Sequence, residues 1–282
     1  MQFKNNEAEI FIPDNKPVDE AVERTTHMAI SAHQDDIEIM AYDGILKCFG
    51  QNDKWFFSVI ATNGAGSPRD DIYASYTDEQ MMKIRKLEQK KAAYVGEYGA
   101  CAMLDYPSLA VKDPMNKDLV CELKELIKLA RPEIIYTHNP ADKHDTHVAI
   151  TLRVIEALRE LPNEYLPQKL YGCEVWRALD WINDDEKVYF DVAGHPNIAA
   201  AVLAVHDSQI CGGKRYDLAT AGRRAANATY AQSHGTDNSS SMIYAIDLTP
   251  LVQDKNLDVL SYVKGYIDRF RQDVTSKISK LI

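Results

Sequence analysis

The chain has 282 residues, and 32 Lys and Arg against 42 Asp and Glu give it a formal net charge of −10 at pH 7. A balance this acidic argues against nucleic acid as a partner, because proteins that grip a phosphate backbone display a basic face. With 45 % hydrophobic and 26 % charged residues, the composition is that of a folded globular protein. We expect one domain over residues 1–282, with its core at about 22–165 and C-terminal strands and helices over 166–282.

The first half of the chain alternates short apolar runs with longer stretches of helical period. Runs rich in β-branched and aromatic residues predict strands at 28–32, 55–62, 102–106 and 133–137. Apolar residues at three- and four-residue spacing predict helices over 78–98, from Leu119 until Arg131-Pro132, and over 147–161. This alternation predicts an α/β fold with a mostly parallel sheet and helices on both faces. Ligands of such sheets bind outside the carboxyl ends of the strands.

Beyond residue 161 the pattern is looser. We expect strands at 170–175 and 188–192, helices at 198–205 and 215–234, and a loop over 234–241. The final segment places one apolar stripe on a helix, made of Leu260, Val263, Ile267, Phe270, Val274 and Leu281. This stripe could pack on the core or pair subunits, so a homo-oligomer stays open.

Cysteine usage and hydropathy indicate in which cellular compartment the protein is expected. The five cysteines contain no C-x-x-C pair, which favours buried, reduced thiols over a disulfide framework or a thiolate zinc site. The first residues lack a basic segment followed by an apolar one, and no stretch approaches the ~18 apolar residues of a membrane span. We therefore expect a cytoplasmic protein with no membrane partner.

A first polar cluster follows the strand at 28–32. His33, Asp35 and Asp36 come within four residues, and on a helix His33 and Asp36 at i and i+3 could reach one ion. Adjacent carboxylates repel, and a divalent cation holds both ionised. The alternative is that one of these aspartates only caps the next helix.

A second cluster follows the strand at 133–137. His138, His144 and His147 fall within ten residues, and His144 and His147 are again at i and i+3. Both clusters follow strands of one sheet and could converge at its carboxyl edge. Two His and one Asp leave a tetrahedral zinc with an open position, as catalytic sites require. A solvated His-rich loop is the alternative.

These segments together resemble a known family. Residues 32–36 (AHQDD), 62–67 (TNGAGS) and 144–147 (HDTH), in this order, resemble the LmbE/PIG-L-like zinc-dependent N-deacetylases. A fainter resemblance continues at 190–192 and 206–209. In two places the chain departs from the family's A-H-P-D-D-E, with Gln34 for Pro and Ile37 for Glu.

The resemblance implies a Rossmann-like fold and one Zn²⁺ per chain. It implies that His33, Asp36 and His147 bind the zinc, that Asp35 is the general base and that His144 is a second catalytic group. The implied reaction removes an N-acyl group, above all acetyl, from a small-molecule amino sugar or its conjugate. Zinc would activate the water while Asp35 takes its proton.

Three further residues are candidates for substrate binding. Arg69 could reach a sugar hydroxyl or an anionic group, or be a solvated loop cation. Arg85 could line the site, as the family's R-x-x-E does, or form a surface ion pair with Glu88 at i+3. His206 could close the pocket or be a core histidine with satisfied hydrogen bonds.

Two rival functions stay open. His and Asp clusters at sheet edges also build two-metal centres, which would indicate a phosphoesterase. A non-catalytic carbohydrate-binding protein could retain the same site, although a pure binder has no need of Asp35 as an unliganded carboxylate beside the metal.

Overall fold

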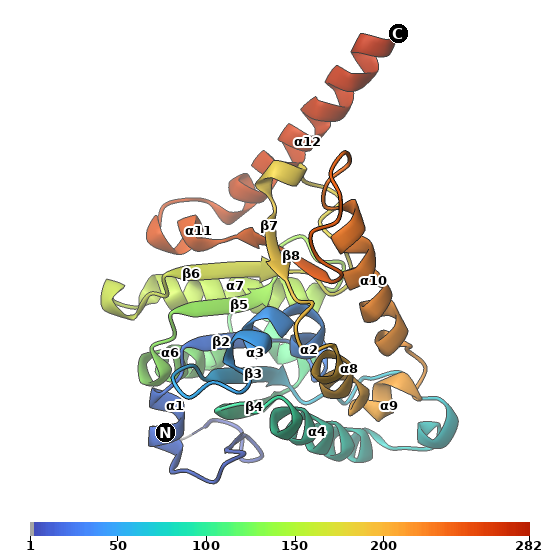
Figure 1. The fold of residues 1–282 in the computed structure, drawn as a ribbon. Coiled ribbons are helices and arrows are strands. Elements are labelled where there is room, and N and C mark those ends of the chain that lie inside the picture. The colour runs from blue at the N-terminus through green and yellow to red at the C-terminus, as the bar shows by residue number, and fades with distance from the viewer. Residues whose placement is uncertain (1–2) are drawn as a thin grey trace.

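A computed structural model describes residues 3–282, whose strands form one eight-stranded sheet in the order β1-β4-β3-β2-β5-β6-β8-β7 (Figure 1). The strands are β1 (Glu9–Phe11), β2 (His27–Ser31), β3 (Phe56–Thr62), β4 (Ala100–Tyr106), β5 (Ile134–His138), β6 (Lys169–Cys173), β7 (Val188–Asp191) and β8 (Met242–Asp247). The strands from β4 to β6 pair in parallel, whereas β1, β8 and β7 pair antiparallel at the two edges. The predicted mostly parallel α/β sheet is confirmed.

Helices cover both faces of the sheet, as predicted. They are α1 (Val18–Glu23), α2 (Asp36–Met40), α3 (Tyr42–Cys48), α4 (Asp78–Val95), α5 (Ser108–Lys112), α6 (Asp118–Ala130), α7 (Asp145–Glu160), α8 (Pro196–Ala204), α9 (Asp207–Ile210), α10 (Tyr216–Tyr230), α11 (Thr249–Gln253) and α12 (Val259–Leu281). Successive residues of β2 point to opposite faces, so Met28 packs with α6 and α7 while Ala29 packs with α2 and α3. These two apolar layers hold the sheet between them.

The strand order reverses at β2, and this reversal places the site. From β2 the chain proceeds through β3 to β4 on one side, and later through β5 to β6 on the other. His27 of β2 lies opposite Ile134 of β5, so the two strands run side by side toward the same edge. Loops that leave β2 and β5 in opposite directions open a crevice between them.

Some expectations need correction. The strands β1 and β8 were not predicted, and β8 inserts between β6 and β7. The cysteines are all free, but only three are buried, because Cys121 and Cys211 are exposed. No helix within residues 3–282 combines the length and apolar character that a membrane crossing needs.

The C-terminal helix is divided between packed and projecting parts. The side chain of Asp258 caps α12 by accepting from the Ser261 amide, and Val263 and Tyr266 are buried against the body. Beyond these turns the helix runs out as an arm that ends far from the sheet (Figure 1). The stripe therefore packs on the core only at its beginning.

Candidate metal centre and active site

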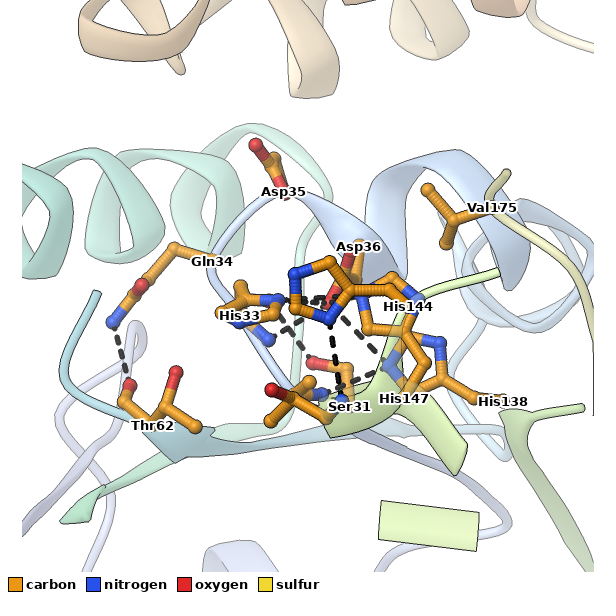
Figure 2. A network of polar contacts seen from close by, with 12 residues as sticks. Ser31, His33, Gln34, Asp35, Asp36, Thr62, His138, His144, His147 and Val175 are labelled. Atoms are coloured by element: carbon orange, nitrogen blue, oxygen red, sulfur yellow. Dashed lines mark hydrogen bonds and ion pairs between the residues drawn. The ribbon is translucent and has the colours of Figure 1, made fainter. Parts of the chain in front are cut away.

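The loop between β2 and α2 separates two neighbouring carboxylates. Asp36 is the first residue of α2, whereas Asp35 before it has φ +89° and ψ −31°. This conformation is unfavourable for a residue with a Cβ and costs on the order of 1–3 kcal/mol. Figure 2 shows Asp36 among the histidines and Asp35 apart from them on the loop. The strain thus gives the two carboxylates different environments.

Three side-chain atoms that can bind a metal ion form an almost equilateral triangle. Asp36 Oδ2 lies 3.2 Å from His33 Nδ1 and 3.3 Å from His147 Nε2, and the two ring nitrogens are 3.3 Å apart. Ligands at ~2.0–2.1 Å from a tetrahedral zinc are about 3.3–3.4 Å from one another. The triangle therefore fits a zinc ion, and it is one of two groups within residues 3–282 that could hold a metal.

Asp142 supports His147 from behind. Its Oδ1 lies 3.4 Å from His147 Nδ1, so Nε2 is turned toward Asp36. The same carboxylate accepts from the amides of His144 at 3.0 Å and Val175 at 3.2 Å. Burial raises the pKa of Asp142, but the His147 ring outweighs it, and the result is a pKa of about 2.

His138 is a part of the site that the sequence analysis did not assign. It ends β5, is buried, and stacks on His147 with ring centres 3.9 Å apart. Its Nε2 accepts from the Ala32 amide at 2.9 Å and lies 3.3 Å from Asp36 Oδ2. Its place at the end of a predicted strand, inside the His-rich segment, was the available signal.

The second metal-capable group is explained without an ion. It consists of His138, Asp142 and His147. Both oxygens of Asp142 already accept backbone hydrogen bonds, and His138 Nε2 is bonded to the Ala32 amide. We therefore assign these residues to the support of the first group.

The charges of this cluster balance around one carboxylate. Burial raises the pKa of Asp36, but the rings of His147 and His138 outweigh it and hold this pKa well below its usual range. Burial lowers the pKa of His147, but Asp36 and Asp142 together raise it to about 10. Asp36 is thus ionised, and its negative charge is balanced by the histidine rings beside it. A cation bound there would balance the same charge.

Asp35 faces the cavity beside a buried guanidinium. Its Oδ2 lies 3.7 Å from Arg85 Nη2, and it belongs to neither metal-capable group. Burial raises the pKa of Asp35 to about 7, although Arg85 acts in the opposite direction. The alternative left open for Arg85, an ion pair with Glu88, is absent from residues 3–282, because Glu88 accepts from the amide and hydroxyl of Ser208 instead.

The loop that carries Asp35 is tied to the end of β3. Gln34, in the position of the family's proline, donates to the Thr62 carbonyl at 3.0 Å, and its own carbonyl accepts from Arg85 at 2.7 Å. Gly64 has φ +73°, and a Cβ there would lie 2.6 Å from Gln34 Oε1. Hydrogen bonds thus hold a loop that a proline ring would otherwise stiffen.

Two predicted substrate residues lie outside the cavity lining. Arg69 donates to Asp78 and to the Ala65 carbonyl. His206 is buried with its Nε2 3.3 Å from Glu38 Oε2, where Glu38 also accepts from Tyr98. Their role in substrate binding stays a prediction.

A cavity of about 520 Å³ opens over the triangle. The N-terminal part contributes His33, Asp35, Asp36, Arg85 and His144 to its lining, among others, and the C-terminal part contributes Trp176, Gln209, Lys214 and Tyr216. The exposed His144 ring lies 5.1 Å from that of His33, centre to centre. The catalytic roles of Asp35 and His144 stay predictions.

A C-terminal helix also holds α2, the helix that begins at Asp36. Arg224 of α10 is buried and donates to the Glu38 carbonyl at 2.6 Å and the Ile39 carbonyl at 3.2 Å. These are among the last carbonyls of α2, which have no partner within the helix. Asp36 therefore stands on a helix fixed from both halves of the chain.

Comparisons with known proteins give a family match and several solved structures of the same fold. Residues 28–158 match the family model described as PIG-L, GlcNAc-PI de-N-acetylase. The comparison with curated sequences gives no match.

Solved structures share the fold at low identity. The N,N'-diacetylchitobiose deacetylase of Pyrococcus horikoshii is 16 % identical with a TM-score of 0.62, covering 82 % of this chain and 86 % of its own. The 4-carboxy-2-hydroxymuconate hydratase GalB of Pseudomonas putida is 16 % identical with a TM-score of 0.61, and the match covers 79 % of this chain and 96 % of GalB. A zinc-inhibited form of teicoplanin deacetylase Orf2 is 14 % identical with a TM-score of 0.56, and the match covers 79 % of this chain and 98 % of Orf2.

Proposed function

The chain belongs to the PIG-L family of GlcNAc-PI de-N-acetylases through residues 28–158, and on that premise we propose that it is a zinc-dependent amide hydrolase. Its substrate is an amino sugar or sugar conjugate from which it removes an N-acyl group, above all acetyl. One observation carries the proposal. His33, Asp36 and His147 place three donors 3.2–3.3 Å apart at the floor of an open cavity.

The residues around the cavity fit the chemistry of amide hydrolysis. Zinc held by His33, Asp36 and His147 would supply Lewis-acid polarisation of the amide carbonyl and of the attacking water. Asp35 removes a proton from that water and returns it to the departing amine. His144 donates a hydrogen bond to the oxygen of the attacked carbonyl.

The environment of Asp35 supports its role as the base. The carboxylate lines the cavity but lies outside the metal-capable groups. Arg85 and the strained backbone at φ +89° hold it in this orientation. A binding protein without catalysis would gain nothing from this strain.

The C-terminal part supplies an aromatic wall for a sugar. Trp176 lines the cavity, with its ring edge-to-face against Tyr216 and Lys214 Nζ 5.4 Å from the ring centre. An indole face stacks on the apolar face of a pyranose ring, and lysine can donate to its hydroxyls. These contacts favour a carbohydrate over a purely aliphatic amide.

The assay that tests this function measures primary amine released from N-acetylhexosamines and their glycosides, with and without a chelator. We expect release that the chelator abolishes and added zinc restores. Phosphomonoester cleavage with two bound ions per chain would favour the phosphoesterase instead. Sugar binding with no amine release would favour the binding protein.

Single substitutions separate metal binding from catalysis. Asp35→Asn should retain zinc but lower kcat by about 10²–10⁴-fold, because the general base is lost. His144→Ala should also retain zinc and lower kcat. His147→Ala should lose zinc by elemental analysis. Normal turnover in Asp35→Asn, or full zinc content in His147→Ala, would contradict the assigned roles.

A further inference from the structure

The projecting part of α12 carries an apolar stripe that the body of the protein leaves uncovered. Its residues recur at intervals of three, four, four and three, which keeps them on one face of the helix. They are Ile267, Phe270, Val274, Ile278 and Leu281. Ile278 is 54 % exposed and Leu281 is 86 % exposed. Only the first turns of the helix bury their apolar side chains against the sheet domain.

An arm of this kind is unfavourable in isolation. Helices gain most of their stability in proteins from packing an apolar face, and an isolated helix of this length is marginal in water. A continuous exposed apolar stripe with polar flanks marks an interaction site. The uncovered stripe therefore offers a surface that a partner can cover.

The charges around the arm identify that partner. The whole chain carries −10, but α12 has five Lys and Arg against two Asp, and its only charged side chains beyond Val274 are Lys277 and Lys280. At its base lies a cavity of about 580 Å³ lined by Phe270, Asp273 and Lys277 of the helix and by Asp180 and Asp185 of the neighbouring loop, among others. Within residues 3–282, Asp180, Asp185 and the distal Lys280 form no ion pair.

One chain thus carries both halves of a complementary surface. We propose that two copies of this protein dimerise by packing their α12 arms antiparallel, stripe against stripe. Lys280 near the end of each arm then meets Asp180 and Asp185 beside the start of the other arm. A parallel pairing would instead bring the two acidic loops together. This dimer is independent of the proposed hydrolase function.

The mass of the full-length chain in solution tests the pairing. We expect sedimentation equilibrium to give twice the chain mass of 31.8 kDa. Val274→Glu with Ile278→Glu should give a monomer, because four carboxylates would enter the interface. Gln272→Glu with Ser279→Glu adds the same charge on the opposite face, and this control should stay dimeric.

Cross-linking tests the orientation. Ile267→Cys and Leu281→Cys are prepared separately in a background with Cys121→Ser and Cys211→Ser, which removes the two exposed native thiols. Antiparallel pairing places position 267 opposite 281 of the partner, so a disulfide-linked dimer should form only when the two variants are mixed. Equal cross-linking of either variant alone would contradict this orientation.

Either of two results overturns the proposal. One is a wild-type monomer, including a monomer whose arm binds anionic vesicles, and the other is an oligomer that survives Val274→Glu with Ile278→Glu. Far-UV circular dichroism and thermal melting should show that both double variants remain folded, because all four positions are exposed.

Discussion

At the scale of single residues, Asp142 lies behind His147, which we propose as a zinc ligand. Asp142→Asn should weaken zinc affinity about 10–100-fold, because the amide no longer fixes the charge and orientation of His147. Competition with a chromophoric chelator measures this. Asp145→Asn is the control: Asp145 is exposed near the same helix end and should retain wild-type affinity. Equal losses in the two variants would contradict the assignment.

Glu174 should give stability a dependence on pH. It accepts from Trp181 Nε1 at 2.9 Å and the Leu179 amide at 2.6 Å, but burial raises its pKa from the ordinary 4.5 to about 7. The unfolded chain therefore releases this proton first as pH rises, and stability falls between about pH 4.5 and 7.

Glu174→Gln removes that proton exchange. The free energy of unfolding of the wild type, relative to the variant, should fall by about 3 kcal/mol from below pH 4.5 to above pH 7. Urea titrations at several pH values, followed by tryptophan fluorescence, measure the difference. A difference that is constant over this range would show that Glu174 ionises normally in the folded protein.

The sequence was informative about site residues where they are close in sequence or follow a strand. His33, Asp36 and His147 converge because β2 and β5 are neighbours, which the α/β pattern predicts. Contacts between side chains of different helices, strands and loops could not be predicted from the sequence. Arg69 turns to Asp78 and His206 to Glu38, and these pairings depend on how the loops and helices pack in three dimensions.

At the scale of elements, α3 approaches the sheet so closely that Gly44 has no room for a side chain. A Cβ there would lie 2.7 Å from Tyr136 Cε2 and 2.8 Å from Phe56 Cε2, both in buried rings. Gly44→Ala should destabilise the protein by about 1–3 kcal/mol through overpacking. Thermal unfolding measures the change.

Gly222 provides the matched control within another helix. It is exposed in α10, and a Cβ there would meet nothing within 4 Å. Gly222→Ala should stabilise the protein by about 0.5–1 kcal/mol, because alanine favours the helix. The opposite signs of the two changes are the prediction, and equal effects would refute the packing argument.

Long periodic elements were predictable, and short or nonlocal ones were not. The helices α4, α6 and α7 carry many turns of one pattern. The start of α7 lies at Asp145 rather than His147, because the His144 ring accepts from the Thr146 amide as a cap. No local signal could place β8 between β6 and β7, since β8 lies far along the chain from β6.

At the scale of the whole molecule, the two halves share a core. One apolar layer joins Met28 and Ile135 of the N-terminal strands to Leu170, Ile246 and others of the C-terminal part. We therefore predict one cooperative unfolding transition, in keeping with the expected single domain. Far-UV circular dichroism and tryptophan fluorescence should give coincident urea curves, and two separated midpoints would indicate independent domains.

The grip of Arg224 on α2 also bears on how such chains can be recombined. Its guanidinium reaches the carbonyl of Glu38 across 186 positions of sequence. Chimeras that exchange the C-terminal half between homologues would therefore also exchange the residue that holds α2 in place. Grafts of this half should transplant α2 and α10 as a matched pair, so that the position of Asp36 is preserved.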